Sequence, residues 1–220
     1  MNREIVLRLS KYRRLLQKLK IIGLEKVFSN NLGDALGVTP ALVRKDFSHL
    51  KITGNKRGGY IIDDLIASIN LILCKNHPLE IIVVGCGKIG TALMQHRGLA
   101  EDGIKVAAGF DIKPEKISKN SEIPILGIEE LDSFIKNRQI KVGVISVPES
   151  MATSVFEKMV SAGITGFLNF SPVELKFNKD SQLFDNSNSC FINNINLAVE
   201  IENLFYYVNS RDKEEKQASN

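Results

Sequence analysis

A glycine-rich segment and a later aspartate carry the most specific chemical signal in this sequence. Gly85, Gly87 and Gly90 fit the pattern G-x-G-x-x-G, which follows the apolar run "EIIVVG" and opens the helical pattern "KIGTALMQHR". In such a segment the first glycine permits a tight turn, the second lets the backbone approach a pyrophosphate, and the third lets helix and strand pack closely. Asp111 ends the next apolar run, 21 residues after Gly90, where a carboxylate can accept hydrogen bonds from the hydroxyls of an adenine ribose. The spacing therefore predicts a dinucleotide site.

Three residues between the glycines and two at the end of a later apolar run are expected to line the same site: Cys86, Lys88, Ile89, Val147 and Pro148. Ligands bind at the carboxyl ends of the strands in open α/β sheets, although Pro148 could equally do no more than end its strand. The carboxylate of Asp111 would repel a 2′-phosphate, which favours NAD(H) over NADP(H) as the cofactor. The positive charge of the neighbouring Lys113 would weaken that preference.

The side chains that catalysis or metal binding would need are not grouped in the sequence. None of the three histidines follows a late strand, as the acid/base of a dehydrogenase would: they are His49, His77 and His96. The three cysteines form no CxxC pair and no zinc spacing, which favours unpaired thiols in a reducing compartment: they are Cys74, Cys86 and Cys190. Cys86 would become redox-active only if the helix N-terminus lowered its pKa. We expect neither enzyme activity nor a metal site.

The charge of the chain is unevenly distributed. Residues 1–60 carry a balance of +9 and residues 61–220 a balance of −5, within a net charge of +4. This asymmetry is typical of a basic module joined to a neutral or acidic one, with a polyanion as the partner of the basic module. A solvated basic face is the alternative that charge alone leaves open.

The pattern within the basic segment predicts a helix-turn-helix. Ser29 can cap a short helix over 30–36, a turn at Gly37 follows, and Thr39 can cap the next helix with Pro40 at its first position. On that helix the inward positions are apolar, and the outward positions that could contact DNA are Arg44, Lys45 and Ser48.

A basic wing is expected directly after this helix. The segment "KITGNKRGGYII" predicts a glycine-rich hairpin with Lys56 and Arg57 near its tip and Tyr60 at the start of the return strand. Cations at such a tip can reach phosphates or the minor groove. The combination predicts binding to double-stranded DNA, and an interaction-only winged helix is the alternative. A winged helix that binds a palindromic operator needs a two-fold partner.

Strand and helix patterns alternate after the wing, which places the glycine segment in a parallel sheet with helices on both faces. A linking helix, "DDLIASINLILCKNHP", is expected to end at Pro78. The predicted fold class is α/β: an N-terminal winged helix-turn-helix, then a Rossmann-like parallel-sheet domain and a C-terminal helix. The expected boundaries are 1–77 for the DNA-binding domain, 78–194 for the NAD(H)-binding domain, 195–209 for the last helix and 210–220 for a disordered tail.

The last helix, "INLAVEIENLFYYVN", has a broad apolar stripe that includes Leu197, Ile201, Leu204 and Val208. The stripe could pack on the helix's own sheet or be exchanged with a second subunit, and the sequence leaves both open. No apolar run is long enough to span a bilayer, and the N-terminus has no apolar core of signal-peptide type. We expect a cytoplasmic protein that does not associate with membranes.

Taken in order, several blocks of the sequence resemble the Rex family, the redox-sensing transcriptional repressors of bacteria. The matching blocks include "RLSKYRRLL", "VRKDFSHL", "GNKRGGY", "VVGCGKIGTAL", "NFSPVEL" and "FINNINLAVEIENL". The resemblance implies a homodimer with exchanged C-terminal helices that leaves its operator when NADH rises relative to NAD+. It also implies that Arg44, Lys45, Lys56 and Arg57 contact DNA, and that Asp111 and the glycine segment hold the coenzyme.

The sequence departs from the family pattern at three positions. His96 stands where the family usually has a tyrosine, and Asn196 stands where it usually has an aspartate that bonds either that tyrosine or an arginine matching Arg14. A neutral amide cannot form the charge-assisted bond to Arg14, so the NADH switch is expected to be altered or lost. Lys51 occupies a position that the family often gives to glycine.

Two other functions remain open from the sequence. One is a winged-helix regulator whose Rossmann-like domain binds another nucleotide or an acyl-CoA. The other is an oxidoreductase with a vestigial winged helix, which would need a late-strand histidine or lysine that the sequence lacks.

Overall fold

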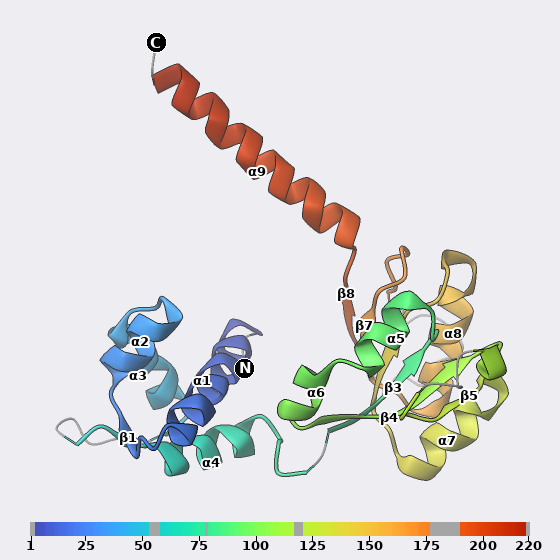
Figure 1. Ribbon diagram of the computed structural model, residues 1–220, viewed down its shortest axis with the longest axis horizontal. Helices are drawn as coiled ribbons and strands as arrows, with labels where there is room; N and C mark the ends of the chain where they lie inside the picture. The colour runs from blue at the N-terminus through green and yellow to red at the C-terminus, as the bar shows by residue number, and fades with distance from the viewer. Residues whose placement is uncertain (1–2, 53–57, 78, 117–120, 177–189, 219–220) are drawn as a thin grey trace. The chain divides into compact units, whose positions relative to one another are not determined.

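The computed structural model describes residues 3–52, 58–77, 79–116, 121–176 and 190–218. The chain divides into two compact units, Met1–Leu79 and Glu80–Asn220 (Figure 1). Each unit has its own hydrophobic core. Lys56 and Arg57, which were expected near the tip of the wing, lie outside the described residues.

The N-terminal unit packs helices around a small aromatic and aliphatic core. Tyr12 and Phe47 meet edge to face at 5.3 Å between ring centroids, and Phe47 meets Tyr60 in the same way at 5.1 Å. Leu65 and Ile69 are buried in the same core, so the helix that carries them belongs to this unit. The described elements are α1 (Arg3–Ile21), β1 (Lys26–Val27), α2 (Ser29–Leu36), α3 (Pro40–His49), β2 (Tyr60–Ile61) and α4 (Ile62–Ile72).

The helix starts follow from local chemistry, with one correction. Thr39 caps α3 as predicted, because its hydroxyl oxygen accepts the Leu42 N–H at 3.2 Å and Pro40 follows it. The prediction that Ser29 caps α2 is wrong. Phe28 holds the cap position and donates its N–H to the side-chain oxygen of Asn31 at 3.1 Å, while Ser29 is buried as the first helical residue.

The strand pairing beside the wing segment was not predicted, and the predicted end of the linking helix is wrong. The described part of β2 pairs antiparallel with β1, Lys26 opposite Ile61 and Val27 opposite Tyr60. The tip of the predicted wing hairpin, residues 53–57, lies outside the described residues. A two-residue strand such as β1 has no sequence period of its own, which is why the pattern did not reveal it. The helix α4 ends at Ile72, well before Pro78. Its last buried residue is Ile69, which packs in the core of the N-terminal unit, so the helix ends where its contacts with that core end.

The C-terminal unit is built on a sheet whose described strands have the order β5-β4-β3-β6-β7-β8. Each strand pairing that the structure records in this sheet is parallel. With the first strand at the centre and the order reversing beside it, this is the doubly wound arrangement of dinucleotide-binding folds. The strands are β3 (Leu79–Val84), β4 (Ile104–Asp111), β5 (Ile125–Gly127), β6 (Val142–Ile145), β7 (Gly166–Asn169) and β8 (Phe191–Asn194).

Helices cover both faces of this sheet. Ile82 packs with Ile135 of α7 and Met159 of α8, whereas its neighbour Val83 packs with Met94 of α5. Successive residues of a strand point to opposite faces, so α7 and α8 cover one face and α5 covers the other. The helices of this unit are α5 (Lys88–Met94), α6 (Arg97–Glu101), α7 (Leu131–Arg138), α8 (Glu149–Ala162) and α9 (Leu197–Ala218), with short 3-10 turns η1 (Pro114–Lys116) and η3 (Ile128–Glu130).

The last helix, α9, is a single helix that extends to Ala218 (Figure 1). The predicted end of this helix at residue 209 is therefore wrong, because the helix continues into the segment 210–220 that was predicted as a disordered tail; residues 219 and 220 lie outside the described residues. Arg, Lys, Glu, Gln and Ala are strong helix formers, and they dominate "SRDKEEKQA". The apolar stripe lies open on the single chain, with Leu204 and Phe205 each 64% exposed. Among the described helices, none has the length and apolar character needed to cross a bilayer.

Candidate nucleotide pocket and DNA-binding surface

A pocket of about 470 Å³ lies where the sheet order reverses, beyond the carboxyl ends of β3, β4, β6 and β7. This is the place where open parallel sheets bind ligands. Most of its described walls are apolar, and its lining comprises Val84, Gly85, Gly87, Ile89, Phe110, Asp111, Ile112, Ile128, Ser146, Val147, Pro148, Met151, Val155, Phe170 and Pro172.

The three glycines of the G-x-G-x-x-G segment have three different structural roles. Gly85 has φ +92°, and a Cβ there would approach the backbone oxygen of Ser146 to 2.5 Å. A Cβ at Gly90 would overlap the carbonyl oxygen of Gly85, so only glycine permits this helix and turn to pack so closely. A Cβ at Gly87 would meet no described atom within 4 Å. Gly87 therefore leaves open space in front of the α5 N-terminus, where N–H groups favour an anion.

Ser146 fixes the glycine turn from the neighbouring strand. Its hydroxyl donates to the carbonyl oxygen of Gly85 at 2.7 Å, and the Thr91 hydroxyl donates to the carbonyl oxygen of Cys86 at 2.8 Å. Sequence reasoning selected Val147 and Pro148 in "SVP" and missed the serine. Only the pairing of β6 with β3 brings Ser146 to this turn.

The carboxylate of Asp111 is held at the mouth of the glycine turn by two backbone donors. One oxygen accepts the Cys86 N–H at 2.8 Å and the other accepts the Lys113 N–H at 3.0 Å. A carboxylate offers about four acceptor positions, so two remain for ligand hydroxyls. Lys88 and Ile89, the other expected cradle residues, are exposed at the start of α5.

Cys86 is a buried structural thiol. Its S–H donates to the carbonyl oxygen of Phe110 at 3.6 Å. Burial, and then the neighbouring Asp111 carboxylate, raise the pKa of Cys86 to about 12. The helix N-terminus therefore does not make it a thiolate, and the redox-active alternative is not supported.

Cys86 should resist alkylation in the folded protein. Iodoacetamide reacts with the thiolate, which is scarce at pH 8 for a buried thiol whose pKa is about 12, whereas Cys74 is exposed. Mass spectrometry of peptides after brief labelling at pH 8 should find Cys74 modified and Cys86 unmodified. Labelling in urea provides the control, because both thiols should then react. Equal labelling rates in the folded protein would contradict the burial described here.

A buried amide holds the loop that forms the far wall of the pocket. Asn169 is fully buried, and its side-chain N–H groups donate to the Val173 carbonyl at 2.7 Å and to the Asn194 side-chain oxygen at 2.8 Å. Its own side-chain oxygen accepts from the N–H and hydroxyl of Ser171. This network shapes the turn that presents Phe170 and Pro172 to the pocket. No sequence pattern indicated this network, because Asn169 and Asn194 meet only through the pairing of β7 and β8.

The outward face of α3 is the candidate DNA-binding surface. Arg44, Lys45 and Ser48 are exposed, as the helical spacing predicted, while Val43 and Phe47 are buried on the opposite face. The helix thus presents two adjacent cations and a hydroxyl to solvent. Such a face can contact phosphates and base edges.

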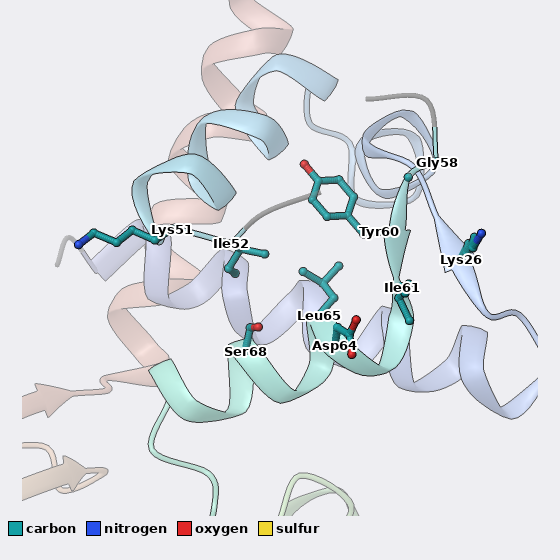
Figure 2. A pocket seen from close by; sticks show the side chains of 10 residues that line it. Lys26, Lys51, Ile52, Gly58, Tyr60, Ile61, Asp64, Leu65 and Ser68 are labelled. Atoms are coloured by element: carbon teal, nitrogen blue, oxygen red, sulfur yellow. The ribbon is translucent and has the colours of Figure 1, made fainter. Parts of the chain in front are cut away.

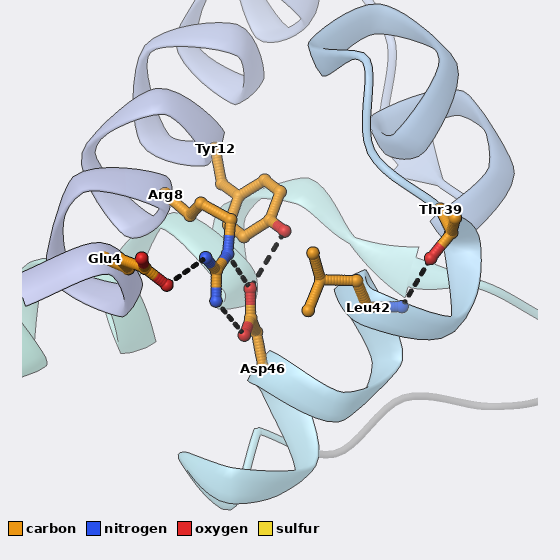
Figure 3. A network of polar contacts seen from close by, with 6 residues as sticks. All are labelled: Glu4, Arg8, Tyr12, Thr39, Leu42 and Asp46. Atoms are coloured by element: carbon orange, nitrogen blue, oxygen red, sulfur yellow. Dashed lines mark hydrogen bonds and ion pairs between the residues drawn. The ribbon is translucent and has the colours of Figure 1, made fainter. Parts of the chain in front are cut away.

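An ion pair that the sequence did not predict locks α3 to α1 (Figure 3). Asp46, only 2% exposed, accepts two hydrogen bonds from the Arg8 guanidinium at 2.7 and 2.8 Å and a third from the Tyr12 hydroxyl at 3.1 Å. The hydrogen bonds from Arg8 hold the pKa of Asp46 below its ordinary value. Burial is the main cause that raises the pKa of Tyr12 to about 12. The network fixes the face that carries Arg44 and Lys45.

The three residues expected to take part in the NADH switch lie on the surface of a helix or at the start of one. Arg14 is exposed on α1. His96 is exposed and occupies the N-cap position of α6, so the expectation that it lies within the first helix after the glycines is wrong, because that helix ends at Met94. Asn196 caps α9: its side-chain oxygen accepts the N–H groups of Ala198 at 3.1 Å and Val199 at 3.3 Å.

A second cavity, of about 550 Å³, lies in the N-terminal unit beside β2 (Figure 2). It is bounded by β2, by the start of α4 and by the residues after α3, and its lining includes Ile52, Tyr60, Asp64, Leu65 and Ser68. In the described part of the chain, no group of three or more His, Cys, Asp or Glu side chains could hold a metal ion.

Together the fold and the pocket define a protein that joins a winged helix-turn-helix unit to a dinucleotide-binding Rossmann unit. Residues 76–173 match the family described as "CoA binding domain", and residues 3–48 match "Putative DNA-binding protein N-terminus". The chain is 33% identical over 205 residues to the redox-sensing transcriptional repressor Rex of Syntrophobacter fumaroxidans, covering 92% of this chain and 93% of the relative. It is 37% identical over 180 residues to Rex of Brevibacillus brevis, covering 81% and 87%. The chain belongs to the Rex family of redox-sensing transcriptional repressors.

Solved structures share the fold. The structure of RSP in complex with β-NAD+ and operator DNA matches with a TM-score of 0.83 and 24% identity, covering 100% of this chain and 98% of that chain. The structure of RSP in complex with β-NADH matches with a TM-score of 0.77, also at 24% identity, covering 98% of each chain.

Proposed function

We propose that this protein is a cytoplasmic, homodimeric repressor that binds operator DNA and binds NAD(H) in the pocket of its C-terminal unit. Residues 1–77 would bind DNA, and residues 78–194 would bind the coenzyme. The observation that carries the proposal is the glycine turn at the reversal of the sheet, with open space at Gly87 and the Asp111 carboxylate beside it. The Rex relatives, and the RSP structures that contain NAD+ with operator DNA or NADH, support it.

The pocket is suited to hold a coenzyme rather than to use it in catalysis. Asp111 is the one titratable side chain among its described lining residues, and both of its oxygens accept backbone hydrogen bonds. A hydride transfer to a carbonyl would need a proton donor near the nicotinamide. We therefore propose a sensor and not a dehydrogenase.

Dimerisation would cover the apolar stripe of α9. Leu204, Phe205 and Tyr207 are each more than 60% exposed in the single chain, and contiguous apolar surface of this kind mostly marks an interface. A two-fold dimer would also present two α3 helices to a palindromic operator.

The function is tested by titrating NADH and NAD+ against binding of the protein to an operator duplex that it selects from a randomised palindromic pool. We expect specific binding in NAD+ and, because His96 and Asn196 depart from the family pattern, only slightly weaker binding in NADH, measured by fluorescence anisotropy at fixed salt. Equal affinity in the two coenzymes would contradict the redox response and leave the repressor proposal standing. That result is the one expected if His96 and Asn196 abolish the NADH switch.

An Asn196→Asp variant provides a matched comparison. Aspartate caps a helix start as well as asparagine does, so α9 should begin at the same residue while the position gains a charge. We expect a larger difference between NADH and NAD+ in this variant than in the wild type.

A second candidate ligand is an acyl-CoA. The match of residues 76–173 to a family described as a CoA binding domain and the apolar pocket walls favour it. Calorimetry with NADH and with acetyl-CoA separates the candidates, and heat with acetyl-CoA but not NADH would replace NAD(H) in the proposal.

A further inference from the structure

We propose that Lys51 is an additional DNA phosphate contact, placed at the end of α3 by a backbone turn that would favour glycine. The inference rests on the proposed DNA-binding function and deepens it. It concerns one residue that lies outside the predicted DNA-binding set, which comprises Arg44, Lys45, Ser48, Lys56 and Arg57.

The chain leaves α3 through a tight left-handed turn. The Lys51 N–H donates to the Ser48 carbonyl at 3.0 Å, and the Ile52 N–H donates to the Phe47 carbonyl at 2.8 Å. This pair of bonds is the Schellman motif, whose first residue after the cap adopts the left-handed conformation. Lys51 holds that position with φ 57°. Glycine is favoured there because any Cβ crowds the following carbonyl, so a lysine carries a backbone cost that glycine would not.

Nothing in the described residues of the N-terminal unit accounts for the lysine. Within the described part of the chain, its ammonium has no hydrogen-bond or ion-pair partner, whereas Arg8 pairs with Asp46 and Lys20 pairs with Asp63. Lys51 is exposed and lies at the edge of the second cavity, and Figure 2 shows its ammonium pointing away from the other residues that line this cavity. The ammonium therefore lies outside the core and faces solvent rather than the interior of that cavity.

The position of Lys51 suits a polyanion. Lys51 comes directly after the C-cap of α3, the helix that exposes Arg44 and Ser48, and it precedes the basic segment that contains Lys56 and Arg57. The proposed DNA surface thus continues from the exposed face of α3 through Lys51. A flexible ammonium at such a point contacts phosphate as a point charge and carries no sequence information.

Three substitutions separate charge from backbone geometry. Lys51→Gly removes the charge and relaxes the turn, Lys51→Ala removes the charge and keeps the Cβ, and Lys51→Arg keeps both charge and Cβ. Lys136→Ala changes the net charge equally on α7 of the other unit, where Lys136 pairs with Asp132. All are made in the full chain.

We expect the affinity for DNA to depend on the charge at position 51, and the stability of the protein to depend on whether the residue there has a Cβ. The loss of one phosphate contact makes the negative slope of log K against log salt less steep by about 0.9. This corresponds to an affinity about eightfold weaker at 0.1 M salt. We expect this loss for Lys51→Gly and Lys51→Ala on both the selected operator and a scrambled duplex, and wild-type affinity for Lys51→Arg and Lys136→Ala. Lys51→Gly alone should raise Tm, by about 2 °C.

Two results would overturn the inference. Wild-type affinity and salt slope in Lys51→Gly would show that the ammonium does not contact DNA, while the proposed function would stand. A loss confined to the selected operator would show that Lys51 contacts a base and not a phosphate. Failure of the wild type to bind either duplex would instead overturn the proposed function, so the two failures are distinguishable.

Discussion

Replacement of Asp46 by alanine should destabilise the N-terminal unit by about 3 kcal/mol, the cost of removing one partner of a buried ion pair. The carboxylate is 2% exposed and accepts three hydrogen bonds, from Arg8 and Tyr12. Without it the Arg8 guanidinium and the Tyr12 hydroxyl lose their acceptor in a partly buried site. Because this network joins α3 to α1, the face that carries Arg44 and Lys45 should lose its fixed position, and operator binding should weaken.

Urea denaturation at pH 7 measures the change in unfolding free energy, and anisotropy measures the change in operator affinity. Asp34→Ala is the matched control, because Asp34 is an exposed carboxylate on α2 of the same unit. It removes the same charge and should leave both quantities nearly unchanged. A variant Asp46→Ala as stable as the control would show that the network contributes nothing to the fold.

The stabilisation by Asp46 should depend on pH in a defined direction. Hydrogen bonds from Arg8 lower its pKa in the folded protein below the unfolded value of about 3.9. Its contribution is therefore complete above about pH 4 and is lost as pH falls through the lower, folded value. The gap in stability between wild type and Asp46→Asn should be constant from pH 7 to about pH 5 and should close in more acidic solution.

Local patterns were enough to predict the parts of the site that lie close together in the sequence. The glycine turn is specified by three residues and the strand before it, and the cap of α3 by Thr39 and Pro40, so each could be recognised without tertiary information. The alternation of strand and helix also predicted the parallel sheet, because each of its longer strands has its own apolar run.

The missed features depend on partners that are distant in the sequence. Arg8 and Asp46 are 38 residues apart, and Asn169 and Asn194 are 25 apart, so neither pair has a sequence period. The strand β5 has three residues and is defined by its pairing with β4. The break before His96 is equally hidden, since "KIGTALMQHR" keeps a helical pattern across it.

Replacement of Asp111 by alanine should weaken NADH binding about 30-fold, because a hydrogen bond to a charged group contributes about 2 kcal/mol. The Asp111 carboxylate accepts hydrogen bonds from the N–H groups of Cys86 and Lys113, and it keeps acceptor positions for the ribose hydroxyls. Its removal would also leave those donors without an acceptor and loosen the glycine turn. NADPH binding should suffer less, because the variant no longer repels a 2′-phosphate, so the preference for NADH should shrink.

Calorimetry with NADH and NADPH checks both expectations. Asp132→Ala, which removes an exposed carboxylate on α7 of the same unit, should bind NADH as the wild type does. Asp111→Asn separates charge from shape, since its amide oxygen can still accept the Cys86 N–H. If the ribose is recognised through the negative charge, this variant should bind NADH weakly and discriminate poorly against NADPH. Unchanged NADH affinity in Asp111→Ala would show that the adenine ribose lies elsewhere, and the assignment of this carboxylate would be wrong.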